Sequence, residues 1–109
     1  MTQRDPHKAA DFIIKNAPKF AEAKANRLYL EEFRKTKKAL LMNESQAKTV
    51  TDREAYAYAH PDYVKVLQDF KNAALDEERL RLEIRAAELV IDLYRTEQAS
   101  NRNQVRALQ

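Results

Sequence analysis

Apolar residues in the C-terminal half of the chain recur at steps of three and four, the spacing of one helical face. A first seam runs through Val66, Phe70, Ala73, Leu80, Ile84, Ala87, Ile91 and Tyr94, with Glu77 at a position where an apolar residue is expected. No glycine or proline follows Pro61 in this stretch. The pattern therefore predicts one helix over residues 61–103, about 60 Å long. A compact domain of this size has a radius of gyration of about 13 Å, so we expect this helix to project into solvent or to be covered by another subunit.

A second apolar seam lies on another face of the same predicted helix and consists of Leu75, Leu82, Ala86, Leu89 and Leu93. One seam can pack on the other long helix of the chain, which leaves the second without an intramolecular partner. A homodimer with coiled-coil-like packing is the simplest way to cover it. The sequence leaves parallel and antiparallel pairing open.

The N-terminal half predicts two further helices before a short third one. Asp5 and Pro6 fit a helix start over 6–17, and Pro18 opens a second helix over 18–42 or continues the first beyond a kink. We expect the core face of that helix to hold Ala23, Tyr29, Leu30, Phe33, Leu40 and Leu41. Residues 51–54 match a capping box for a helix over 52–59, and residues 104–109 are left as a tail that need not be ordered.

These elements predict an all-α fold, a helical hairpin or bundle that forms one domain over residues 1–109. The chain contains no glycine and no cysteine, which argues against tight-turned sheets and excludes disulfides and thiolate metal sites. No apolar window approaches the length of a membrane span, and no signal peptide is recognisable at the start. We expect a soluble intracellular protein that neither enters membranes nor uses a cofactor.

The charge is unevenly divided, because residues 1–50 carry 11 basic and 6 acidic side chains, whereas residues 51–109 carry 9 and 11. Five of the basic side chains, Lys24, Arg27, Arg34, Lys35 and Lys38, fall on the face of the second predicted helix opposite its expected core face. Such a row could follow a phosphate backbone of DNA or RNA. A solvated lysine-rich face is the more common reading of this pattern.

Candidate catalytic chemistry is sparse. His7 with Asp11 and His60 with Asp62 lack the spacing of a metal site, so we expect solvated or capping histidines. Glu77 is the one carboxylate at a seam position, where it could fix helix register or pair across an interface. Tyr56 and Tyr58 belong to a tyrosine-rich segment that suits helix-junction packing, a protein interface or base stacking. We expect no enzyme and no small-molecule substrate.

The run from Arg53 to Tyr63, REAYAYAHPDY, and the run from Tyr94 to Arg102, YRTEQASNR, resemble small uncharacterised proteins encoded by tailed bacteriophages and prophages. The resemblance implies an accessory protein that binds a host or phage protein, or one that assists DNA transactions. It also implies the cytoplasm of a bacterial host cell. The surplus helix length, the two apolar seams and the lack of a catalytic motif favour an adaptor or inhibitor of a larger machine that acts by protein contact. The alternative is a nucleic-acid-binding factor of phage recombination, replication or transcription.

Overall fold

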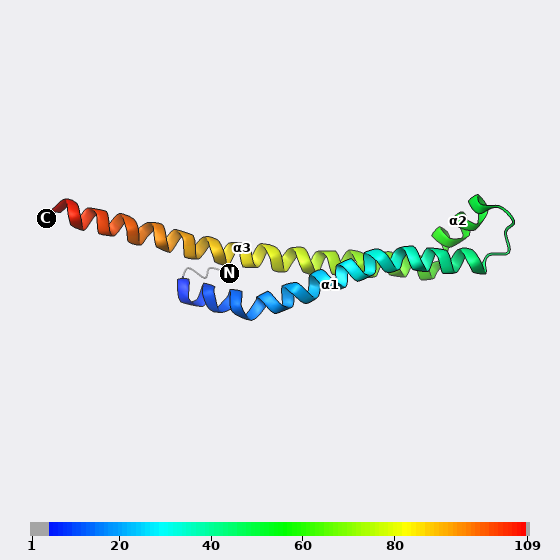
Figure 1. The fold of residues 1–109 in the computed structure, drawn as a ribbon, viewed down its shortest axis with the longest axis horizontal. Coiled ribbons are helices and arrows are strands. Elements are labelled where there is room, and N and C mark those ends of the chain that lie inside the picture. Colours follow the sequence, from blue (N-terminus) through cyan, green and yellow to red (C-terminus); the bar gives the residue numbers. More distant parts are fainter. Residues whose placement is uncertain (1–4, 109) are drawn as a thin grey trace. The chain divides into compact units, whose positions relative to one another are not determined.

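The computed structural model describes residues 5–108, which form three helices and no strand (Figure 1). These are α1 (Pro6–Glu44), α2 (Val50–Ala59) and α3 (Pro61–Leu108). The predicted all-α fold with one very long C-terminal helix is confirmed.

The described chain forms two compact units where the sequence predicts one domain. One unit consists of residues 5–20 and 79–108, and the other of residues 21–78. Each unit contains a part of α1 and a part of α3, because both helices continue from one unit into the other. We call them the terminal unit and the central unit and describe each by itself.

Helix α1 is continuous through Pro18, so of the two predicted alternatives the continuation is found and the separate helices over 6–17 and 18–42 are not. The side chain of Asp5 accepts a hydrogen bond of 2.8 Å from the backbone N–H of His7, so the predicted helix start is confirmed. Pro18 lies inside the helix with its ring exposed. Proline removes one backbone donor, but the helix continues through this position.

Helix α2 begins two residues earlier than predicted. Thr49, and not Thr51, is its N-cap: the Thr49 hydroxyl accepts a hydrogen bond of 3.1 Å from the backbone N–H of Asp52. Thr49 has extended backbone angles, as an N-cap residue usually does. The predicted capping box at residues 51–54 is therefore wrong, since its threonine already lies within the first turn.

Helix α3 begins at Pro61, as predicted, and continues past the predicted end at residue 103. His60 is extended, which is the conformation favoured before a proline, and its Nδ1 accepts a hydrogen bond of 3.0 Å from the backbone N–H of Asp62. Residues 104–108 of the predicted tail are helical, whereas Gln109 lies outside the described residues. The predicted capping role of a histidine is thus confirmed for His60.

The core of the central unit lies where α1, α2 and α3 meet. It consists of Leu41, Ala57 and Tyr63, with Met42 packed against it. Each of the three helices supplies one of the buried residues, so this small cluster connects α2 to both long helices. Val66 is also buried one turn along α3 from Tyr63.

The buried face of α1 agrees in part with the predicted one, since Leu41 is buried and Ala23, Leu30 and Phe33 are half-buried. Tyr29 and Leu40, expected in the core, are 65% and 51% exposed, whereas Leu41 is 1% exposed. Arg27 and Arg34, expected on the opposite face, are half-buried. Long basic side chains can cover apolar surface with their methylene groups, which allows them to occupy a helix interface.

The first seam of α3 is confirmed almost throughout its length. Val66, Leu80 and Ala87 are buried, and the seam residues between and after them are half-buried as far as Ile91. Tyr94, the last member, is exposed. Beyond it every described residue of α3 except Ala99 is exposed, so the C-terminal part of the helix is open to solvent.

Candidate interaction surfaces

A stripe of apolar side chains is exposed on α3 in the terminal unit. We call it the leucine stripe, and it consists of Leu82, Ala86, Leu89 and Leu93. Its three leucines are 50–53% exposed, although the first seam on the same helix is covered. Leucine on an exposed face at steps of four and three is typical of a surface that packs on another helix.

Leu75, the remaining member of the second predicted seam, lies in the central unit. Its side chain is 63% exposed. The predicted exposure of this seam is thus confirmed, although other apolar residues of α3, such as Val64, Leu67 and Tyr94, are exposed as well. All five members of the second seam are exposed.

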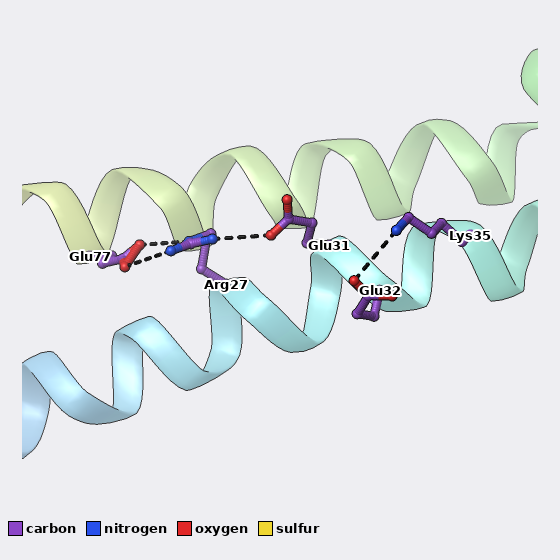
Figure 2. Close-up of polar contacts among 5 residues, drawn as sticks. All are labelled: Arg27, Glu31, Glu32, Lys35 and Glu77. Atoms are coloured by element: carbon purple, nitrogen blue, oxygen red, sulfur yellow. Dashed lines mark hydrogen bonds and ion pairs between the residues drawn. The ribbon is translucent and has the colours of Figure 1, made fainter.

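In the central unit, a bidentate ion pair joins α1 to α3. Arg27 Nε lies 2.7 Å from Glu77 Oε1, and Arg27 Nη2 lies 3.1 Å from Glu77 Oε2. The third nitrogen, Nη1, donates to Glu31 one turn along α1 at 3.1 Å (Figure 2). The predicted pairing of Glu77 across an interface is found here, between two helices of one chain.

This pair shifts the pKa values of both partners. Hydrogen bonding from Arg27 lowers the pKa of the Glu77 carboxyl, and partial burial works against that effect. Hydrogen bonding to Glu77 in turn raises the pKa of Arg27. Both shifts favour the charged forms of the two groups, as is usual for a hydrogen-bonded ion pair.

The five basic residues expected on one solvated face do not share one environment. Lys24 and Lys35 are exposed, and Lys35 lies 3.5 Å from Glu32 (Figure 2). The other three are half-buried: Arg27 pairs with acidic groups, Arg34 stands 5.7 Å from the Phe70 ring centre, and Lys38 lies over a tyrosine ring. The predicted solvated position of Arg27, Arg34 and Lys38 is therefore wrong.

Lys38 contacts both an aromatic ring and an acidic side chain. Its Nζ is 4.7 Å from the ring centre of Tyr58 and 3.8 Å from Glu54 Oε1. Contact with Tyr58 raises the pKa of Lys38, desolvation lowers it, and Glu54 adds a smaller upward effect. Tyr58 also meets the buried Tyr63 edge to face at 5.3 Å between ring centres.

An open pocket of about 520 Å³ occurs in the same region of the central unit. Its lining consists of Arg34, Lys35, Lys38, Ala39, Met42, Tyr58 and Tyr63. Two sequence signals that are far apart in the chain, the basic segment of α1 and the tyrosines beside α2, meet here. The sequence singled out both signals, but it did not predict that they share one pocket.

Tyr56, the other tyrosine expected at an interface, is 41% exposed. Its ring meets His60 at 5.6 Å between ring centres. Its neighbour Ala57, and not Tyr56, belongs to the buried cluster. Tyr56 therefore remains available for contact with another molecule.

The described residues contain no group of three or more His, Cys, Asp or Glu side chains placed to hold a metal ion. Within the same residues no helix has an apolar stretch that could cross a membrane. The chain matches no protein-family model, no curated protein and no solved structure. Its function must therefore be argued from its own surfaces.

Proposed function

We propose that this protein acts without catalysis, as an adaptor or inhibitor that binds other proteins through helical surfaces. The observation that carries the proposal is the exposure of the leucine stripe on α3. Burial of a leucine side chain contributes about 1.5–3 kcal/mol, so three half-exposed leucines on one stripe leave a substantial favourable energy unused. A helix of a protein partner is the element that fits such a stripe.

The remaining features support binding rather than chemistry. The bidentate ion pair between Arg27 and Glu77 joins two helices of the chain. The resemblance of two segments to phage accessory proteins supports the same class of function. We place the protein in the cytoplasm of a bacterial host, with a host or phage protein as its target.

The test is the association of a variant in which the stripe is made acidic. Leu82→Glu with Leu89→Glu should abolish association through the stripe, measured as light-scattering mass. The helical circular dichroism should stay unchanged, because both side chains are already half-exposed. The matched control is Leu28→Glu with Leu40→Glu on α1, which places the same charges at comparably exposed leucines. Unchanged association of the stripe variant, or equal loss in both variants, would refute this proposal.

A second candidate function is nucleic-acid binding, and the pocket in the central unit favours it. Residues 33–43 carry four basic side chains and no acidic one. Tyrosine rings beside cations are the usual means of holding a single strand, since bases stack on the rings and phosphates pair with the cations. The acidic Glu54 and Glu32 beside two of these cations count against strong binding.

Titration with a fluorescent single-stranded oligonucleotide tests this second function. Lys35→Glu changes a pocket residue that is exposed, and Lys24→Glu makes the same change outside the pocket. If the pocket binds the strand, only Lys35→Glu should weaken binding about ten-fold or more, and added salt should weaken the wild type steeply. Absence of binding at low salt would remove this function from consideration.

A further inference from the structure

We infer that the leucine stripe binds the same stripe of a second copy of this chain, and that the two α3 helices run antiparallel. The inference rests on the proposed function, because it names the occupant of the surface proposed there. It is carried by the charges that flank the stripe. In a two-helix coil these flanking side chains lie close enough to select the orientation of the partner.

The heptad positions follow from the spacing of the stripe. Leu82 and Leu89 take the d positions, and Ala86 and Leu93 take the a positions. The flanking positions are then g, which holds Arg85 and Asp92, and e, which holds Glu83, Val90 and Glu97. Arg85, Asp92 and Glu97 are exposed, and Glu83 and Val90 are half-buried.

Parallel pairing is disfavoured by these charges. In a parallel pair each g residue faces the e residue five positions later on the other helix. Asp92 would then face Glu97 of the second copy, and by symmetry this acidic contact would occur twice. Arg85 would face Val90, which offers it no charge.

Antiparallel pairing instead matches unlike charges, because g residues then face g residues. Placing Leu82 opposite Leu93 of the second copy also sets Ala86 opposite Leu89, so that each small residue meets a large one. In that register Arg85 faces Asp92 of the second copy, again twice by symmetry. Glu83 faces Val90, so no like charges meet on the other flank.

The same charges also select this register over its nearest alternative. A shift by one heptad would place Arg85 opposite Arg85 of the second copy and Glu83 opposite Glu83. Both contacts are repulsive, and Arg79 would enter the apolar layer opposite Leu89. The sequence therefore favours the first register over this shift, because all four layers of the stripe are then apolar.

The orientation is tested by charge reversal at Asp92. Asp92→Arg should weaken the dimer about three- to ten-fold if the helices are antiparallel, because the introduced guanidinium would face Arg85 of the second copy twice. Arg85→Asp should do the same, and the double variant should return to within about two-fold of the wild type. In a parallel dimer Asp92→Arg would strengthen association, since it would remove two acidic contacts. Glu88→Arg, with the same change of charge away from the stripe, is the control.

A distance measurement provides an independent answer. The chain has no cysteine, so Gln104→Cys creates one unique site for a spin label on an exposed residue of α3. At 1.5 Å per residue, the two labels of the antiparallel dimer should be roughly 50 Å apart. Parallel helices would keep them within about 20 Å. A wild type that stays monomeric would defeat this inference and leave the proposed binding of another protein standing, whereas a dimer with the short distance would defeat only the antiparallel arrangement.

Discussion

Arg27 Nε and Glu77 Oε1, fifty residues apart in the sequence, lie 2.7 Å from one another and join α1 to α3. The carboxylate side chain is mostly covered, and its second oxygen binds a further nitrogen of the same guanidinium. Removal of either partner leaves a partly desolvated charge unpaired, whereas removal of both does not. The contact therefore makes the two residues strongly interdependent.

The first prediction follows from that interdependence. Arg27→Met and Glu77→Leu should each lower the thermal unfolding midpoint of the protein. The double variant should be more stable than the sum of the two single effects indicates, because apolar side chains of similar length can occupy both positions. Thermal denaturation followed by circular dichroism measures all four proteins. Strictly additive effects would contradict a direct energetic coupling.

The second prediction concerns acid. The pKa of Glu77 is lowered from its ordinary value of 4.5, so the unfolded chain binds this proton more readily than the folded one. The stability that the shift contributes should be complete above pH 4.5 and lost as the pH falls through the lowered pKa. Glu77→Gln should show a smaller loss over this range than the wild type. Parallel curves of unfolding midpoint against pH for the two proteins would contradict the assignment.

The third prediction compares two adjacent leucines. Leu41→Ala removes a buried side chain from the core of the central unit and should cost about 2–4 kcal/mol of unfolding free energy. Leu40→Ala removes the same atoms from an exposed position and should cost under about 1 kcal/mol. Urea denaturation measures both variants. Equal costs would mean that the buried face of α1 is not the one described.

The fourth prediction concerns the start of α2. Thr49→Ala should destabilise the protein by about 1 kcal/mol, because it removes the acceptor for the N–H of Asp52. Thr51→Ala, at the residue that the sequence pattern designated as the cap, should change stability by less than about 0.5 kcal/mol. Chemical denaturation of the two variants decides between the caps. A larger effect at Thr51 would favour the helix start predicted from the sequence.

The sequence predicted α3 well because its apolar residues repeat without interruption. Val66, Leu80 and Ala87 are buried and the leucines of the stripe are exposed, as expected from spacing alone. On α1 the spacing predicted Ala23, Leu30, Phe33 and Leu41 correctly but not Tyr29, Leu40 and the arginines, since hydropathy assigns arginine to solvent and leucine to the core. The partners of Arg27 and Arg34, Glu77 and Phe70, lie far along the sequence on α3. No pattern within α1 could have shown that they would cover these side chains.

The pocket in the central unit also depends on contacts between residues that are far apart in the sequence. Periodicity identified the basic segment and composition identified the tyrosines, but only the folded chain places Lys38 over Tyr58. The helix ends were similarly hard to locate from sequence. Thr49 and Thr51 are equally suitable N-cap residues by type. Which of them caps α2 depends on where the loop before the helix ends.

The central claim is that this chain associates with a protein partner through α3 and that its partner on the leucine stripe is a second copy. Light-scattering mass of the wild-type protein over increasing concentration, at low and high salt and with and without a short DNA, tests it most directly. The account predicts a mass that rises from one chain to two, that persists at high salt because the contact is mainly apolar, and that DNA does not alter. A mass of one chain at every concentration, or one that increases only when DNA is present at low salt, would contradict it.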